Sequence, residues 1–249
     1  MVTKTWFASW FDSEYYHILY KNRDDSEART FILNLVNKFR IESKNKVLDL
    51  ACGKGRHSIF LNSLGMDVTG VDLSENSIQF AKQFENERLK FEVHDMREPF
   101  AKNSFDFVLN LFTSFGYFEN DEDNLKTILA VVQNMKADGI FLIDFFNAHK
   151  ILANLVSSEI KTIDGIAFEI HKRIENGYIF KQIAFSDQGK DYSFTEKVQY
   201  FSRSDFEILF EKAGLEIVDC FGNYNLESFD EHNSERLILA CKKLSINKI

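Results

Sequence analysis

The chain has 249 residues, of which 45% are apolar and 27% charged, a composition typical of an ordinary globular protein. Its formal net charge of −8 disfavours binding to long nucleic acid, because such a balance gives no general attraction for phosphate. The length favours one core domain with a smaller inserted or appended piece.

The cysteines and the apolar segments indicate a compartment. Three cysteines with no CxxC spacing argue against a disulfide framework and against a zinc site, and they suit a reducing environment. The N-terminus lacks the basic start and apolar run of a secretion signal, and no apolar run approaches transmembrane length. We therefore expect a soluble, cytoplasmic protein with no metal site and no membrane partner.

The first 155 residues alternate between helical and strand patterns. Residues 12–40 have helical periodicity. Short apolar strands are expected at 46–51, 67–72, 89–95, 105–112 and 139–146. Amphipathic helices are expected between them at 56–64, 74–86 and 121–136. This alternation predicts βαβ units and a parallel sheet that is covered on both faces.

The pattern changes to β-rich runs separated by turn signals over residues 156–202. Pairs such as Asp164 with Gly165, and Gln188 with Gly189, are typical of hairpin turns. This segment is therefore expected to form a small antiparallel β insert of three or four strands.

The last part of the chain has the pattern of a helix at 203–213 followed by two strands, 215–222 and 236–243, which would close the main sheet as a hairpin. The expected fold is a doubly wound α/β sheet of seven strands in the order 3-2-1-4-5-7-6, with the last strand antiparallel. The expected divisions are an α/β core with its N-terminal helices (1–155), the insert (156–202) and the closing part of the core (203–249).

The most informative segment is VLDLACGKGRHSIFL, residues 47–61. In it an apolar strand runs into Cys52, Gly53, Lys54 and Gly55, and a helix is expected to begin at once. Glycines there let the backbone turn sharply and let a ligand lie close against it. Alone, this GxGxxS pattern is a defective dinucleotide fingerprint, and it is equally compatible with a simple tight turn.

Carboxylates end the next two expected strands. Asp72 lies seventeen positions after Gly55, where a carboxylate can accept two hydrogen bonds from a ribose diol. Asp95 ends the third strand, and in a doubly wound sheet these strand ends line one crevice. Asp72 has a structural alternative as a cap of the helix that begins near Ser74. The joint pattern favours a site for an adenosine-containing ligand.

The successive segments LDLACGKG, VTGVDLS, HDMRE, FDFVLNLFTSFGYF and MKADGIFLIDFF resemble the motifs of class I S-adenosylmethionine-dependent methyltransferases. The resemblance covers residues 12 to about 146, and EKAGLEIVDCFG fits as well. Within the family, DMRE and FTSFGYF are most similar to small-molecule enzymes, including aminosugar N,N-dimethyltransferases. The resemblance implies S-adenosylmethionine as methyl donor and a small-molecule acceptor with a nitrogen or oxygen nucleophile. The insert would then cover the acceptor pocket or mediate a homodimer.

The resemblance also implies roles for residues of the core. The backbone near Ala51 and Gly53 would receive the methionine moiety, Asp72 the ribose hydroxyls, and Leu73 would flank the adenine. Many relatives have glycine in place of Ala51, so its methyl group would narrow the site slightly. Asp95 would accept from the adenine amino group, and the Met96 backbone would meet the edge of the ring. Leu111 would contact the cofactor near its sulfonium.

The N-terminal stretch YYHILYKNRDDSEAR resembles the helical lid of such enzymes. Tyr16, Tyr20 and Arg29 would approach the methionine end, with Arg29 as a partner for its carboxylate; the alternative is a packing stripe with a solvated arginine. No side chain is assigned as the catalytic base. Tyr117 and His17 are candidates, because each can accept or relay a proton from the methyl acceptor.

Two other classes of protein compete with this interpretation. An NAD(P)-dependent oxidoreductase also uses a glycine loop and an acid after the second strand. However, Ser58 replaces the third fingerprint glycine, and no tyrosine is followed four positions later by lysine. A non-catalytic adenosine-nucleotide-binding module stays open, because methyl transfer requires few catalytic side chains.

Overall fold

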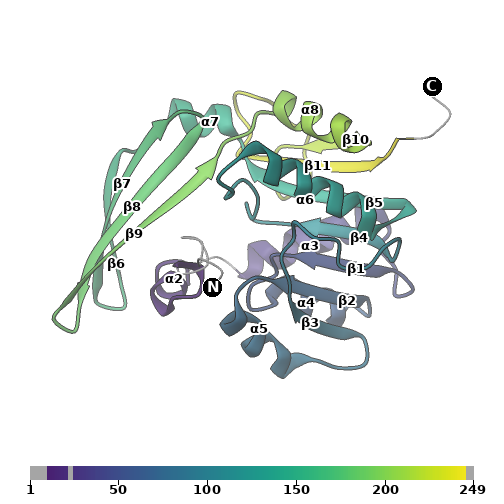
Figure 1. Cartoon of the computed structure of the whole chain (residues 1–249), viewed down its shortest axis with the longest axis horizontal. Helices are drawn as coiled ribbons and strands as arrows, with labels where there is room; N and C mark the ends of the chain where they lie inside the picture. Colours follow the sequence, from purple (N-terminus) through teal and green to yellow (C-terminus); the bar gives the residue numbers. More distant parts are fainter. Residues whose placement is uncertain (1–9, 22–24, 245–249) are drawn as a thin grey trace.

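The structure is a computed structural model that describes residues 10–21 and 25–244. Residues 1–9, where a secretion signal would begin, and 22–24, within the segment expected to be helical, lie outside the described residues. Figure 1 shows two sheets, a larger one flanked by helices and a smaller one at its side, with the short helix α2 (Glu14–Leu19) between them.

The larger sheet has seven strands in the order β3-β2-β1-β4-β5-β11-β10. Its parallel strands are β1 (Lys46–Leu50), β2 (Asp67–Asp72), β3 (Leu89–Val93), β4 (Phe105–Asn110) and β5 (Met135–Phe146). The chain then adds β10 (Leu215–Phe221) and β11 (Arg236–Lys243). Because β11 pairs antiparallel with both β5 and β10, the expected topology is confirmed.

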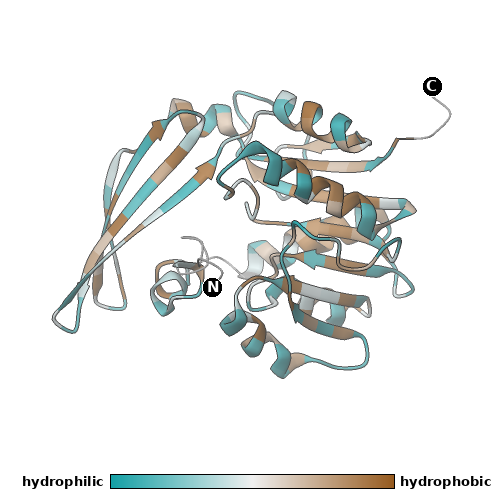
Figure 2. Ribbon diagram, viewed as in Figure 1, coloured by the Kyte–Doolittle hydropathy of each residue, from teal (hydrophilic) through white to brown (hydrophobic). Residues whose placement is uncertain are grey.

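Helices cover both faces of this sheet, because its strands bury alternate side chains on opposite sides. Val47 packs with α3 (Asp25–Phe39), α4 (Arg56–Ser63) and α5 (Glu75–Ala81). Leu48, the next residue, packs on the opposite side. The helices on that side are α6 (Asp121–Asn134) and α8 (Arg203–Ala213). Figure 2 shows the result as brown strands between helices whose outer surfaces are teal.

Several element boundaries differ from the expected ones. The segment expected to be helical from residue 12 contains two helices, and α2 begins because the Ser13 side chain accepts from the Tyr16 amide. The short helix η1 (Lys82–Phe84) continues α5 as a 3₁₀ turn. β5 begins four positions before the expected residue 139, because Met135 pairs with Phe105 on β4.

The smaller sheet is the expected insert. Its four antiparallel strands are β6 (Ser158–Ile163), β7 (Ile166–Glu175), β8 (Tyr178–Asp187) and β9 (Lys190–Gln199), and α7 (Ala148–Ala153) leads into it. Its hairpin turns have two successive residues with positive φ, such as Asp164 at 51° and Gly165 at 82°, as tight hairpins require.

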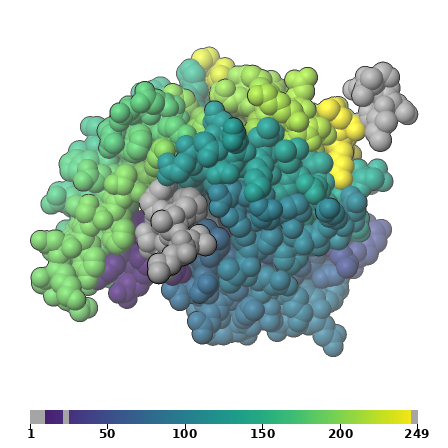
Figure 3. Space-filling view, in the orientation of Figure 1, coloured from purple at the N-terminus to yellow at the C-terminus, as the bar shows by residue number. Residues whose placement is uncertain are grey.

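One face of the insert packs against the N-terminal segment. Phe168 and Ile183 of the insert are fully buried in a cluster with Trp10, Tyr15 and Leu19. Figure 3 shows the purple N-terminal segment between the green insert and the blue core. The N-terminal segment and the insert therefore share one hydrophobic cluster. None of the helices in the described part of the chain is both long and apolar enough to span a membrane.

Candidate active site

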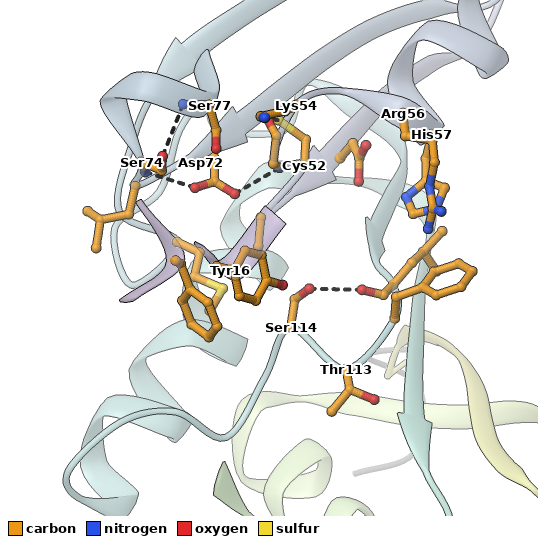
Figure 4. Close-up of a pocket in the computed structure, with 18 of the residues that line it drawn as sticks. Tyr16, Cys52, Lys54, Arg56, His57, Asp72, Ser74, Ser77, Thr113 and Ser114 are labelled. Atoms are coloured by element: carbon orange, nitrogen blue, oxygen red, sulfur yellow. Dashed lines mark hydrogen bonds between the residues drawn. The ribbon is translucent and has the colours of Figure 1, made fainter. Parts of the chain in front are cut away.

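A cavity of about 440 Å³ lies where the carboxyl ends of β1, β2 and β4 face α2. Its wall includes nine of the ten cofactor-binding residues expected from the sequence, which are Tyr16, Tyr20, Ala51, Gly53, Asp72, Leu73, Asp95, Met96 and Leu111. The two catalytic candidates, His17 and Tyr117, line it as well. Figure 4 shows Asp72 and Ser74 on one side and Arg56 with His57 on the other.

The glycine loop forms one wall of this cavity. Gly55 has φ 82°, and a Cβ there would meet the Phe91 ring at 2.6 Å, so packing and backbone both require glycine. Gly53 has φ 56°, and a Cβ there would meet no described atom within 4 Å. The backbone at Gly53 is therefore open to close approach by a ligand.

Asp72 holds the backbone at Gly53 and at Ser74, while Ser74 itself caps α5 through a bond from the Ser77 amide. Its Oδ2 accepts from the Gly53 amide and its Oδ1 from the Ser74 amide, both at 2.8 Å. Burial raises the pKa of the Asp72 carboxyl, and the hydrogen bonds from Ser74 and Gly53 act in the opposite direction. Each carboxylate oxygen keeps a further acceptor position, so Asp72 can hold the loop and still accept from a ribose hydroxyl.

Asp49 is a site residue that the sequence interpretation missed. It lies in β1, is only 1% exposed, lines the cavity and accepts from the Ser58 hydroxyl at 2.5 Å. Burial, the largest cause, and nearby Asp72 raise the pKa of the Asp49 carboxyl to about 7, although hydrogen bonds from Ser58 lower it. The sequence contained one signal for this residue, since Asp49 is the single acid inside the apolar strand KVLDL.

Asp95 lines the cavity beside Met96, but an arginine already binds its carboxylate. Arg97 Nη2 donates to Asp95 at 2.6 Å, and Arg97 Nη1 also contacts Asp123 at 2.9 Å. Burial raises the pKa of the Asp95 carboxyl, and the bonds from Arg97 outweigh it, so the pKa lies below its ordinary value. Asp95 is therefore an ionised acceptor with a fixed orientation.

Tyr16 of α2 and Tyr20, which follows its last residue, line the cavity, and the insert holds the Tyr20 hydroxyl. Tyr20 Oη donates to Glu196 on β9 at 2.7 Å, and Lys181 on β8 contacts the same hydroxyl. Burial, followed by the charge of Glu196, raises the pKa of Tyr20. Asp12 accepts from the Ser74 hydroxyl at 2.7 Å, so the same segment also contacts the core next to Asp72.

Arg29 does not line this cavity. Its guanidinium lies over the Phe60 ring at 5.2 Å and faces a second cavity of about 360 Å³. Arg56 lines both cavities, and it is the arginine among the cations of the main cavity, which also include Lys21 and Lys54. Periodicity placed Arg29 on a helix, but it did not give the direction of the side chain.

The two catalytic candidates differ in their contacts. Tyr117 Oη donates to the Thr113 carbonyl at 3.0 Å, and its ring packs edge-on against Phe11. The His17 ring packs edge-on against Tyr16. Within residues 10–21 and 25–244, no group of three or more His, Cys, Asp or Glu side chains is placed to hold a metal ion.

The backbone at Ala51 has a conformation that favours glycine. Ala51 has φ 59°, a left-handed conformation that costs an ordinary residue about 1–2 kcal/mol. Replacing it with glycine removes this strain, while the unfolded chain gains freedom worth about 0.4–1 kcal/mol. We expect A51G to raise the melting temperature by ~1–4 °C, measured by calorimetry. Ala167→Gly, on the exposed side of β7, should lower it. A lower melting temperature for A51G would contradict the strain argument.

A doubly wound sheet in this order, with a glycine loop and strand-end acids around one cavity, defines a class I S-adenosylmethionine-dependent methyltransferase. The model of the family described as "Methyltransferase domain" matches residues 41–199, which is more than half of the chain. The chain belongs to this family. The match favours a methyltransferase over an oxidoreductase.

Individual relatives agree with this assignment. The putative methyltransferase YqeM of Bacillus subtilis strain 168 is 30% identical over 168 residues, which are 66% of this chain and 57% of that protein. The chain thus matches little more than half of that relative's length. The Streptomyces venezuelae dTDP-3-amino-3,4,6-trideoxy-alpha-D-glucopyranose N,N-dimethyltransferase is 23% identical over 82% of this chain and 90% of its own.

A solved structure has the same fold over nearly the whole chain. It is an S-adenosylmethionine-dependent methyltransferase from Clostridium acetobutylicum ATCC 824, with a TM-score of 0.78 and 20% sequence identity. The superposition covers 93% of this chain and 96% of that one. This likeness extends the shared fold beyond residues 41–199, toward the N-terminal helices on one side and the closing helix and strands on the other.

Proposed function

We propose that the chain binds S-adenosylmethionine in the cavity above the glycine loop and transfers its methyl group to a small-molecule acceptor. The observation that carries this proposal is the arrangement of Asp72 and Gly53. The buried Asp72 carboxylate keeps free acceptor positions and is bonded to the Gly53 amide. No described atom lies within 4 Å of where a Cβ of Gly53 would be, so a ligand can approach the backbone there. A ribose diol and a methionine chain fit these two features.

Further residues supply contacts for the rest of the cofactor. Leu73 is 39% exposed although it is apolar, so it offers a surface for the adenine ring. Asp95 and Met96, which follow β3, line the same cavity. Asp49 also lines the cavity and is a candidate acceptor for an ammonium group, and Arg56 takes the role of carboxylate partner first expected of Arg29.

The chemistry requires little beyond positioning. When bound, S-adenosylmethionine supplies a methyl group on a positively charged sulfur, which is already activated. The rings of Tyr16, Tyr117 and Phe11 line the cavity and are suited to stabilise positive charge near them. Holding an acceptor in line can supply roughly 7–11 kcal/mol of rate enhancement. Tyr117 and His17 stay candidates for the proton transfer.

We propose a nitrogen nucleophile as the first acceptor to test, with an oxygen nucleophile as the alternative. The printed name of the Streptomyces venezuelae relative describes methylation of an aminosugar nitrogen, and this chain covers 90% of that enzyme. Binding of long nucleic acid stays disfavoured by the net charge. The cytoplasmic location and the homodimer also stay predictions.

A turnover screen tests this function. The full chain is incubated with S-adenosylmethionine and separate panels of amines, aminosugars, phenols and thiols, and homocysteine release is measured after hydrolysis of the product. We expect release above the blank with an amine or aminosugar, because orientation beside an activated methyl donor is sufficient for catalysis. Cofactor binding without turnover on any panel member would favour the non-catalytic nucleotide-binding module.

A further inference from the structure

The loop that follows β4 has an unusual backbone. Phe112 and Thr113 are successive non-glycine residues with φ of 58° and 61°, both in the left-handed region. Such conformations persist in bulky or β-branched residues only when the surrounding structure over-determines them. Both residues line the cavity, so the device that holds them bears on the site.

A single buried acid receives both amides of this loop. The Phe112 amide donates to Asp144 Oδ2 at 2.8 Å, and the Thr113 amide donates to the Asp144 carbonyl at 3.0 Å. Asp144 lies near the end of β5 and is 0% exposed. Two hydrogen bonds from adjacent amides to one residue fix the turn of the loop.

An arginine from the neighbouring strand completes the arrangement. Arg236 at the start of β11 donates through Nε to Asp144 Oδ1 at 2.7 Å and through Nη2 to the Thr113 hydroxyl at 2.9 Å. Tyr224 Oη also donates to Asp144, at 3.3 Å. The arginine therefore neutralises the buried carboxylate and binds the loop directly at the same time.

The loop conformation directs the Phe112 side chain. Its ring stacks on His57 at 4.7 Å between centroids, and the Arg56 guanidinium lies 5.0 Å from its centre. Figure 4 shows Arg56 and His57 on the side of the cavity opposite Asp72, with Thr113 and Ser114 on the loop below. The ring thus supports the two basic side chains that face the methionine end of the proposed cofactor.

We propose that Asp144 and Arg236 are positioning residues that hold Phe112 and Thr113 left-handed, so that Phe112, Arg56 and His57 form one wall of the cofactor cavity. Neither Asp144 nor Arg236 lines the cavity, and both act through the loop. The inference rests on the proposed function, since it takes the ligand of the cavity to be S-adenosylmethionine. The competing explanation is that the ion pair only joins β5 to β11.

Calorimetric titration with S-adenosylhomocysteine, the demethylated product, separates the two explanations without knowledge of the acceptor. We expect D144N to weaken binding by about tenfold or more, because losing a residue that orients a binding group costs on the order of 10–100-fold at metal sites, where the same kind of support operates. The matched control is D106N, which breaks the Lys136–Asp106 pair between β4 and β5 away from the cavity. D106N should bind with unchanged affinity.

A rescue variant tests the backbone argument. Glycine adopts positive φ without strain, so adding T113G to D144N should restore the loop. We expect the double variant to bind S-adenosylhomocysteine within about threefold of the wild type. If the ion pair is purely structural, D144N should have a lower melting temperature and an unchanged affinity. Adding T113G should then leave the affinity unchanged as well.

The outcomes distinguish failure of the inference from failure of the proposed function. If D72A weakens binding and folded D144N does not, the positioning inference is wrong and the cofactor site stands. If the wild-type chain does not bind S-adenosylhomocysteine, both are wrong.

A second variant is available if D144N does not fold. T113V is an isosteric change that removes only the hydroxyl bonded to Arg236. It should weaken binding by about threefold, since one such bond contributes on the order of a factor of three to ten. Unchanged affinity in T113V would overturn the inference.

Discussion

Replacing Asp72 with alanine is expected to weaken binding of S-adenosylmethionine and S-adenosylhomocysteine by at least about tenfold. The lost bonds from the ribose hydroxyls are charge-assisted, and each contributes roughly 1.5–3 kcal/mol. The same change leaves the Gly53 and Ser74 amides without their acceptor, so the unliganded chain should also melt at a lower temperature. Calorimetry with each ligand, beside melting of the apo chain, measures both effects.

Two further variants make this test specific to the ribose. D72N keeps one acceptor oxygen, so its loss of affinity should be smaller than that of D72A. D67N changes an acid at the opposite end of the same strand and should leave the affinity unchanged. A lowered melting temperature with unchanged affinity in D72A would mean that Asp72 only holds the glycine loop and the Ser74 amide.

Replacing Asp49 with asparagine is expected to stabilise the unliganded chain at pH 8 while weakening cofactor binding. Burial raises the pKa of Asp49 to about 7, so between about pH 4 and pH 7 the folded chain holds this proton more tightly than the unfolded chain. The cost of burying the charge therefore grows as the pH rises through that window and is fully present above pH 7. An amide avoids this cost and still accepts from Ser58.

Thermal melting at pH 5 and pH 8 measures the effect. We expect D49N to gain on the order of 2 kcal/mol over the wild type at pH 8, which corresponds to ~4–8 °C for a chain of this size. The gain should be much smaller at pH 5. D106N should instead lose stability relative to the wild type. Hydrogen bonds from Lys46 and Lys136 overcome the effect of burial and lower the pKa of Asp106, so its charged form stabilises the folded chain. An equal gain for D49N at both pH values would refute the argument.

The fold follows from local sequence patterns to a large extent. Strands such as 46–51 are short apolar runs because both of their faces are buried, and their alternation with helices specifies the parallel order. The start of β5 was missed because its first residues carry no strand pattern. Pairing of Met135 with Phe105 on β4 decides that boundary, and this contact is made only in the folded chain.

The candidate site also contains residues that the sequence identified and residues that it did not. The glycine loop and Asp72 were identifiable because a short motif places them at adjacent strand ends. The Asp144–Arg236 pair was not, since its two members are 92 positions apart in separate strands. Arg29 shows a different limit, because helical periodicity predicts an element and does not by itself predict which cavity a long exposed side chain faces.

The attachment of α2 to the insert has a consequence for how the molecule is made. Trp10 donates to Glu196, 186 positions later, and Tyr15 donates to Asp187, 172 positions later. At a synthesis rate of about 5–20 residues per second, Trp10 is added to the chain roughly 10–40 s before Glu196 is. The apolar face of α2 therefore has no docking surface until most of the chain has been translated. The glycine loop can fold early, whereas the side of the cavity that α2 forms is completed among the last steps of folding.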